Sequence, residues 1–233
     1  MARLPRLVVP HQAHHVIQRG NDQQLIFRDS EDHQRFLAWL KDAARACAVA
    51  IHAYVLMPNH VHLLATPSTV EGLAQMMQRV GRHYVPWFNQ KHSRSGGLFQ
   101  GRFRTSLIDS TAYFMLCSRY IELNPVRAQI VADPLAFAWS SYAHHAGARP
   151  DAVVTDHALY WALGNTPFER EAAYIELVGQ GLSADELLLI NAAVLKGWPL
   201  GGDAFKLAVQ HKAKRQVLPA RRGRPFKVIA PVE

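Results

Sequence analysis

The sequence contains little cysteine and no long apolar run. Its two cysteines, Cys47 and Cys117, are too far apart in the chain to form the closely spaced pairs typical of disulfide frameworks or zinc sites. Residues 1–15 lack an uninterrupted hydrophobic run followed by a cleavage site of small residues. No stretch approaches the ~20 apolar residues that a membrane helix needs. We therefore expect a cytosolic protein with reduced thiols and no membrane partner.

Acidic residues are also scarce, at 18 against 26 basic ones, and the net charge is +8. The excess is unevenly distributed. Residues 79–127 carry 8 basic and 2 acidic residues, residues 128–210 carry 4 and 9, and residues 211–233 carry 7 and 1. Two basic blocks therefore flank an acidic segment. Basic blocks attract polyanions because each neutralised phosphate releases counterions.

The first basic block suits nucleic acid, although a charged, solvated surface is the alternative. It also contains aromatic residues that could stack on bases or pack in a core: Tyr84, Trp87, Phe88, Phe99 and Phe103.

Local patterns predict the order β-α-β-β-α-β-α up to about residue 124. Alternation or β-rich composition predicts strands at His14–Gly20, Ile51–Met57, His60–Thr66 and 104–110. Apolar stripes predict helices from an N-cap at Ser30 to about Cys47, from Thr69 to about Gln90 with Pro86 as a kink or restart, and from Ser110 to about Asn124, before Pro125. This order indicates the α+β class, with a split βαβ, ferredoxin-like antiparallel sheet and helices on one face.

Two histidines in the third predicted strand, His60 and His62, are separated by a single valine. Side chains alternate along a strand, so both imidazoles emerge on one face about 7 Å apart and can chelate one metal ion. The alternative is that both are ordinary polar-face or core histidines. The chain has 13 histidines, and chance pairs such as His14–His15 and His144–His145 are easily found.

A second group lies in the third predicted helix. Tyr120 and Asn124 are four residues apart and therefore share a helix face, with Arg119 and Arg127 nearby. If this face packs over the histidines, Asn124 can join His60 and His62 as a ligand of Mg²⁺ or Mn²⁺.

The Tyr120 oxygen could then attack a scissile phosphate, leaving a 5′-phosphotyrosine and a free 3′-OH. A phenol with a pKa of about 10 is a weak nucleophile, so the metal and the arginines must stabilise the charge. The alternative is that Tyr120 is an ordinary packing aromatic.

Three separated segments carry a family resemblance: "MPNHVHLLATP", "GLFQGRFRTSLIDS" and "RYIELNPVRA". In this order they resemble the REP-associated tyrosine transposases, which are relatives of the single-tyrosine HUH transposases of insertion sequences. The resemblance extends from about His11 to Ser141 and implies the same split βαβ sheet. It also implies that His60 and His62 are the HUH metal pair, that Tyr120 is the nucleophile and that Asn124 completes the metal shell.

The resemblance further implies a substrate. Family members cut and rejoin single-stranded DNA beside hairpins formed by repetitive extragenic palindromes. Relatives work as monomers or as dimers, and the sequence leaves this choice open. We expect a bacterial, nucleoid-associated protein.

Arginines are the expected DNA contacts, although each could instead be a solvated surface charge. The tail segment "RRGRPFK" is similar to the core of an AT-hook, which reads a narrow minor groove, but a basic tail that binds any nucleic acid is the alternative. The candidates are Arg19, Arg102, Arg104, Arg119, Arg127, Arg221, Arg222 and Arg224.

We divide the chain into a catalytic domain (1–150), a helical appendage (151–210) and a basic tail (211–233). Acidic helices in the appendage would repel DNA, which favours an organising or gating role. Two functions besides transposition remain open at this point. One is a metal-dependent nuclease in which water attacks, and the other is a catalytically silent regulator that binds DNA hairpins.

Overall fold

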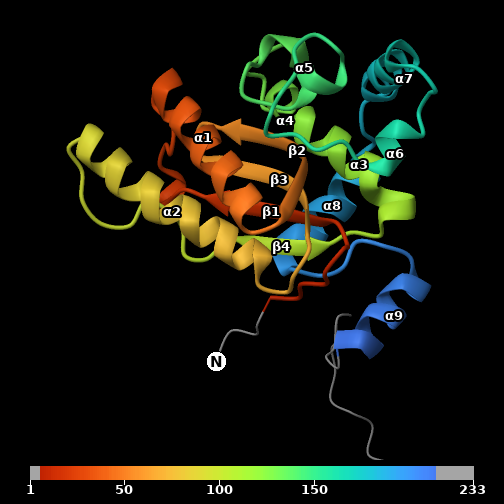
Figure 1. The fold of residues 1–233 in the computed structure, drawn as a ribbon, viewed down its shortest axis with the longest axis horizontal. Helices are drawn as coiled ribbons and strands as arrows, with labels where there is room; N and C mark the ends of the chain where they lie inside the picture. The colour runs from red at the N-terminus through yellow and green to blue at the C-terminus, as the bar shows by residue number, and fades with distance from the viewer. Residues whose placement is uncertain (1–5, 214–233) are drawn as a thin grey trace, which may run out of the picture.

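A four-stranded antiparallel sheet forms the centre of the molecule (Figure 1). The computed structural model describes residues 6–213. The strand order is β2-β3-β1-β4, with β1 at His14–Arg19, β2 at Val49–Met57, β3 at His60–Pro67 and β4 at Arg104–Leu107. The ferredoxin-like sheet expected from the sequence is confirmed, and β1 and β3 are its central strands.

Helices α1 (Ser30–Ala46) and α2 (Gly72–Lys91) cover one face of the sheet, which we call the α1 face. Phe36 of α1 and Tyr84 of α2 pack there against Val16 and Leu63. The N-cap of α1 is Asp29, and the prediction of Ser30 was wrong by one residue. Asp29 accepts from the Asp32 amide while Asp32 accepts from the Asp29 amide, a reciprocal capping box that Ser30 would not form here.

Helix α2 begins at Gly72, three residues later than predicted, and contains Pro86 in its interior. The proline therefore does not start a new helix. The buried side chains of Tyr84 and Phe88 flank it and pack in the core, which offsets the missing backbone hydrogen bond.

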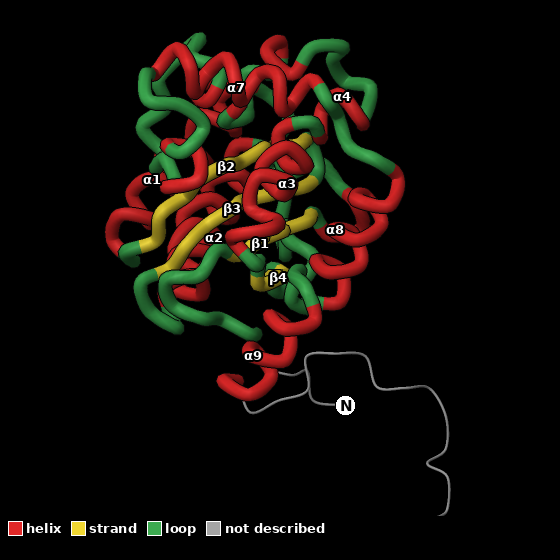
Figure 2. Tube along the Cα trace, turned by 90° about the vertical axis from the view of Figure 1, so that its right-hand side faces the viewer, coloured by secondary structure: helices red, strands yellow, loops and turns green. Residues whose placement is uncertain are grey.

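The opposite face of the sheet, which we call the α3 face, is covered by α3 (Ser110–Glu122) and α8 (Ala184–Lys196) (Figure 2). The prediction of helices on one face was therefore wrong. The physical reason is visible in β2, where residues 53–57 are all apolar. A strand without polar alternation buries both of its faces. Here Val55 packs with Cys117 of α3 and Ile190 of α8, whereas Tyr54 and Leu56 join the other core.

Both edges of the sheet are covered. The β2 edge receives the segment around Ser140, and the β4 edge pairs through Ile108 with Leu200. Covered edges do not offer free backbone groups to another strand. The remaining helices are short or peripheral: η1 (Asn21–Gln23), α4 (Asn124–Arg127), η2 (Pro134–Ala136), α5 (Tyr142–His145), α6 (Ala158–Trp161), α7 (Pro167–Gly179) and α9 (Asp203–Ala213).

A buried carboxylate fixes the end of α3. Glu122 is fully buried and accepts hydrogen bonds from Ser141 (2.5 Å), His145 (2.7 Å) and Tyr174 (2.6 Å). These donors come from α5, α7 and the residue before α5. Such a satisfied network holds α3, and therefore Tyr120, in one position relative to the sheet.

The chain after residue 150 also contacts the sheet, because Ile190 and Ala193 of α8 belong to the core on the α3 face. The domain boundaries at residues 150 and 210 stay a prediction. Within residues 6–213, no single helix is long and apolar enough to span a membrane; α7 and α8 together reach that length, but they meet at an angle of 97°. Arg221, Arg222 and Arg224 lie outside the described residues, and their DNA contacts stay a prediction.

Candidate active site

Strand β3 presents His60 and His62 on the α3 face, with their ring centroids 5.0 Å apart. Their cross-strand partners in β1 are Arg19 and Ile17, respectively. His62 is 2% exposed, whereas His60 is half-buried at the edge of the site. One imidazole is therefore fixed inside the protein, and the other lies between it and solvent.

Helix α3 brings Tyr120 to these histidines within the same chain. The phenol ring is 5.7 Å from the His62 ring, centroid to centroid, and its hydroxyl donates to Asn191 Oδ1 of α8 at 2.8 Å. Arg127 stacks its guanidinium over the phenol, 4.2 Å from the ring centroid, and donates to the Tyr120 carbonyl at 2.8 Å. The phenol is only 5% exposed, so α8 covers it in this structure.

A third imidazole, His15 of β1, completes the cluster. His15 is fully buried, its Nε2 lies 2.8 Å from His62 Nδ1, and its ring is 5.6 Å from that of Tyr120. The interpretation of His14–His15 as a chance pair was wrong for His15. The alternation of side chains along a strand could have indicated its position. His15 and the candidate Arg19 lie four residues apart on one strand and so share a face.

All three imidazoles are neutral at physiological pH. Burial lowers the pKa of His60 to about 4 and that of His15 to about 3, and it holds the pKa of His62 well below its usual value. The positive charge of Arg127 lowers all three further, and Arg19 acts on His60 and His62. Neutral imidazole is the form that ligates metals.

Hydrogen bonds decide which nitrogen of each ring is available. His60 Nδ1 lies 2.6 Å from Asn59 Oδ1, an oxygen that only accepts, so His60 Nδ1 carries the hydrogen and Nε2 presents its lone pair. When His62 Nδ1 donates to His15 Nε2, His62 also presents Nε2. Partners of this kind orient metal-ligating histidines. In these tautomers both Nε2 atoms present a lone pair, as nitrogen ligands of a divalent cation must.

This arrangement leaves one polar atom without a partner. In residues 6–213, His15 Nδ1 is buried and has no hydrogen-bond partner, and it must carry a hydrogen if His15 Nε2 accepts from His62. An unpaired buried donor costs about 1–3 kcal/mol. An unsatisfied polar atom of this kind beside His60 and His62 is a feature found at functional sites.

Asn124 follows Tyr120 by four residues in the sequence. It is buried at the start of α4, and the hydrogen bonds of Leu123 to Arg119 (2.9 Å) and of Arg127 to Leu123 (3.0 Å) continue the helical pattern across the junction with α3. Asn124 is thus one helical turn beyond Tyr120, as expected. No hydrogen bond within the described residues joins its amide to either imidazole, and its role as a metal ligand stays a prediction.

Burial raises the pKa of Tyr120, and the charges of Arg127 and Arg19 oppose this effect. The phenol is therefore neutral in the structure, and the nearby arginines are placed to favour its loss of a proton.

Comparison with known proteins places these residues in a family. The family model described as "Transposase IS200 like" matches residues 8–124, which span β1 to the first residue of α4 and include His60, His62, Tyr120 and Asn124. The chain belongs to the IS200-like transposase family. No curated protein matches the sequence of this transposase.

One of two similar solved structures supports the fold of the transposase. A structure of a REP-associated tyrosine transposase bound to a REP hairpin has a TM-score of 0.53 at 17% identity, covering 68% of this chain and 96% of its own. A putative transposase from Deinococcus radiodurans R1 has a TM-score of 0.36 at 22% identity, covering 52% of this chain and 96% of its own. The first match, at the level of fold, agrees with the resemblance drawn from the sequence.

The candidate arginines of the transposase separate into groups. The guanidinium of Arg127 stacks on the Tyr120 ring. A second group, Arg19, Arg102 and Arg104, lines a small cavity beside β1. The structure does not bring Arg119 to either place. Its guanidinium donates to two carbonyls at 3.2 Å, in Leu177 and Gly181, and is only 11% exposed. Arg119 therefore binds the end of α7 to α3, and it is poorly placed to contact DNA.

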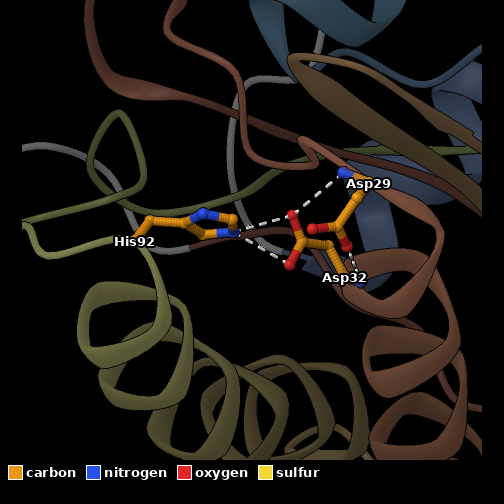
Figure 3. A group of neighbouring side chains, drawn as sticks. All are labelled: Asp29, Asp32 and His92. Carbon is orange, nitrogen blue, oxygen red and sulfur yellow. Dashed lines mark hydrogen bonds and ion pairs between the residues drawn. The ribbon is translucent and has the colours of Figure 1, made fainter.

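A second cluster of potential ligands lies at the ends of α1 and α2. Asp29, Asp32 and His92 point toward one another (Figure 3), with ligand atoms within 4.8 Å. However, the Lys91 ammonium already lies 2.7 Å from Asp29 and 3.1 Å from Asp32. Its hydrogen bond contributes to lowering the pKa of both carboxyls, against the opposing effect of burial. We therefore interpret this group as an ion-pair cluster that joins the two helices, with the cation supplied by the chain.

Proposed function

We propose that this transposase cleaves and rejoins single-stranded DNA beside a hairpin, with Tyr120 as the nucleophile. The observation that carries the proposal is the placement of the Tyr120 ring against His62 and His15 of the same chain. The structural relative bound to a REP hairpin supports a palindromic hairpin as the partner. The bacterial cytoplasm, at the nucleoid, is the matching location.

The proposed metal ligands are His60 and His62 through Nε2, with Asn124 supplying an oxygen. Mixed nitrogen and oxygen ligands suit Mn²⁺ and are compatible with Mg²⁺. When bound, the ion supplies positive charge to the oxygens of the scissile phosphate. With His62 Nδ1 as the donor, the hydrogen bond to His15 would hold the His62 ring in place and leave its Nε2 lone pair free for the cation.

The reaction exchanges one ester bond for another. The Tyr120 oxygen bonds to phosphorus while the bond from phosphorus to the 3′ oxygen breaks. The DNA 5′ phosphate stays on Tyr120, and the phenol proton ends on the released 3′ oxygen. Attack by a 3′-OH on the phosphotyrosine reverses these steps and rejoins the strand. Arg127, stacked on the phenol, stabilises the negative charge that develops on its oxygen.

One observation favours a second candidate, a nuclease in which water attacks. The Tyr120 hydroxyl is buried and donates to Asn191, so it must leave this partner before it can reach a phosphate. Tyr120 would then only pack against the histidines. The third candidate, a silent hairpin-binding regulator, would need neither a metal nor a free hydroxyl.

The test is covalent capture of DNA. A labelled single strand carrying a hairpin is incubated with Mn²⁺ and the protein, then denatured and separated by size. The wild type is expected to yield a denaturation-resistant adduct, and Tyr120→Phe to yield none, because the variant keeps the ring and lacks the oxygen. Tyr113→Phe is the matched control, since Tyr113 lies on the same helix and is expected to leave the adduct unchanged.

The three candidates give different results. An adduct that persists in Tyr120→Phe contradicts the proposed nucleophile. Cleaved DNA without any adduct supports attack by water, and hairpin binding without cleavage under any divalent metal supports the silent regulator.

A further inference from the structure

A small cavity opens beside the histidines on the α3 face. Its volume is about 50 Å³, and it lies between β1, β4, the loop before β4 and the end of α8. Two of its lining residues are apolar and four are polar, of which three are arginines and none is acidic: Ile17, Arg19, Gln100, Arg102, Arg104 and Leu195.

The sheet register fixes the position of this cavity relative to the proposed metal ligands. Ile17 is paired with His62 on one side and with Arg104 on the other, so the three side chains form a row across the sheet on one face. Neighbouring strands are about 4.8 Å apart, which places the Arg104 backbone roughly 10 Å from that of His62. The cavity is therefore beside the candidate active site and separate from it.

Backbone contacts hold the arginines around the cavity. The Gln100 amide donates to the Arg19 carbonyl at 2.8 Å, which fixes the loop to the end of β1. Gly101 has a φ of +62°, a conformation that favours glycine, and there the loop turns into β4. Arg104 donates to the Leu195 carbonyl at 2.8 Å, so α8 closes the far wall.

The charge of the cavity selects the ligand. About 10–15 Å³ of such space holds one water molecule, so 50 Å³ accommodates a group of a few heavy atoms. Three arginines around one cavity suit a tetrahedral oxyanion, to which arginine donates paired hydrogen bonds. A phosphate of the DNA backbone has this chemistry.

We propose that Arg19, Arg102 and Arg104 form a subsite for one backbone phosphate of the substrate strand, close to the cleaved phosphodiester and distinct from it. This proposal rests on the proposed function for the identity of the strand. By holding a neighbouring phosphate, the subsite determines which phosphodiester reaches Tyr120. It is therefore a determinant of the cleavage position.

The experiment is a scan of the hairpin-bearing strand with methylphosphonates, which neutralise one phosphate at a time. Affinity is measured without divalent metal, so that cleavage does not interfere. For the wild type, neutralising one phosphate near the cleavage site is expected to weaken binding about tenfold, as expected for a charge-assisted contact. Arg102→Gln is expected to lose similar affinity for the unmodified strand and to become insensitive at that same position.

Two further variants make the scan specific. Arg104→Lys keeps the charge but loses the fork of donors, and it is expected to show an intermediate loss at the same position. Arg35→Gln removes one exposed charge from α1, on the other side of the sheet, and is expected to keep the wild-type pattern.

Equal losses at every phosphate, or an Arg102→Gln variant that stays sensitive at the wild-type position, would overturn the subsite. Failure of the proposed function would be seen in the covalent-capture experiment, where the wild type would form no adduct. The phosphate scan does not depend on that chemistry, so the two failures are distinguishable.

Discussion

Two clusters of ionisable side chains lie on different faces of the sheet and differ in how completely they are satisfied. At the junction of α1 and α2, Asp29 and Asp32 are neutralised by Lys91, and Asp32 is also bonded by His92. On the α3 face, by contrast, buried imidazoles lie beside arginines and lack any carboxylate partner, and His15 Nδ1 has no hydrogen-bond partner within the described residues. Proximity of potential ligand atoms alone therefore does not identify a metal-binding site.

The difference has a thermodynamic meaning. An internally compensated cluster contributes to stability and has little affinity left for an added ion. A cluster of neutral imidazoles with free lone pairs contributes little to stability and keeps its affinity for a metal ion, because the lone pairs gain a partner only when the ion binds. We therefore expect substitutions in the first cluster to change stability and substitutions in the second to change binding.

The largest effect is expected from the histidine pair. Replacing His60 and His62 with alanine should reduce Mn²⁺ affinity at least about a hundredfold, more than loss of an outer contact would, because both proposed nitrogen ligands are removed. Isothermal titration of the protein with Mn²⁺ at neutral pH measures this change.

The matched variant is Asp32→Asn in the other cluster. It should leave Mn²⁺ affinity unchanged and reduce the free energy of unfolding by about 3 kcal/mol, because Asp32 is a fully buried partner of Lys91 and His92. The comparison fails if Asp32→Asn abolishes Mn²⁺ binding and the double histidine variant retains it.

The pH dependence of stability should separate the two kinds of buried group. Burial lowers the pKa of His14 and His52 to about 4, from 6.5 when unfolded. Their stabilisation is therefore complete above pH 6.5 and is lost as pH falls toward 4, by up to about 3 kcal/mol each. The pKa of Asp32 is lowered from 3.8, so its contribution is lost only at still lower pH.

Denaturant unfolding of the metal-free protein across this pH range is the measurement. We expect stability to decrease between pH 6.5 and 4, and the decrease should become smaller in His52→Gln. A constant free energy of unfolding over that interval would show that these imidazoles are not held neutral.

A smaller effect is expected from His15. His15→Gln should weaken Mn²⁺ binding by about 10-fold to 100-fold, as is typical for a residue that orients a ligand. His14→Gln is the matched control. Its imidazole is equally buried but bonds to the backbone at Gln12 and Val9, so the variant should lose stability and retain Mn²⁺ affinity. Equal Mn²⁺ affinities in wild type and His15→Gln would remove His15 from the site.

Much of the architecture is encoded locally, and so it could be predicted. The spacing of His60 and His62 puts them on one face of any strand, and the pattern around Tyr120 predicts a helix, which ends at Glu122. The two-sided burial of the sheet was also encoded, in the apolar run of residues 53–57. A strand with apolar residues at both parities buries both faces, so this run predicts a helical layer on each side of the sheet.

Other features depend on register and tertiary packing. His15 meets His62 only because β1 pairs with β3 in one particular register. Asn191 reaches Tyr120 through the packing of α8, which no local pattern reveals. Arg119 shows that residues adjacent in sequence can face different surroundings. It precedes Tyr120, which suggested a DNA contact, but its side chain points toward α7.

The central claim, that Tyr120 is the nucleophile, is tested most directly by mapping the covalent bond. Wild-type protein is reacted with the hairpin-bearing strand and Mn²⁺, the DNA is trimmed to a nucleotide, and the peptides are sequenced by mass spectrometry. The account predicts a 5′-phosphate ester on the Tyr120 oxygen. A nucleotide attached to Tyr113 or to any other residue, or cleaved DNA with an unmodified Tyr120 peptide throughout the reaction, would contradict it.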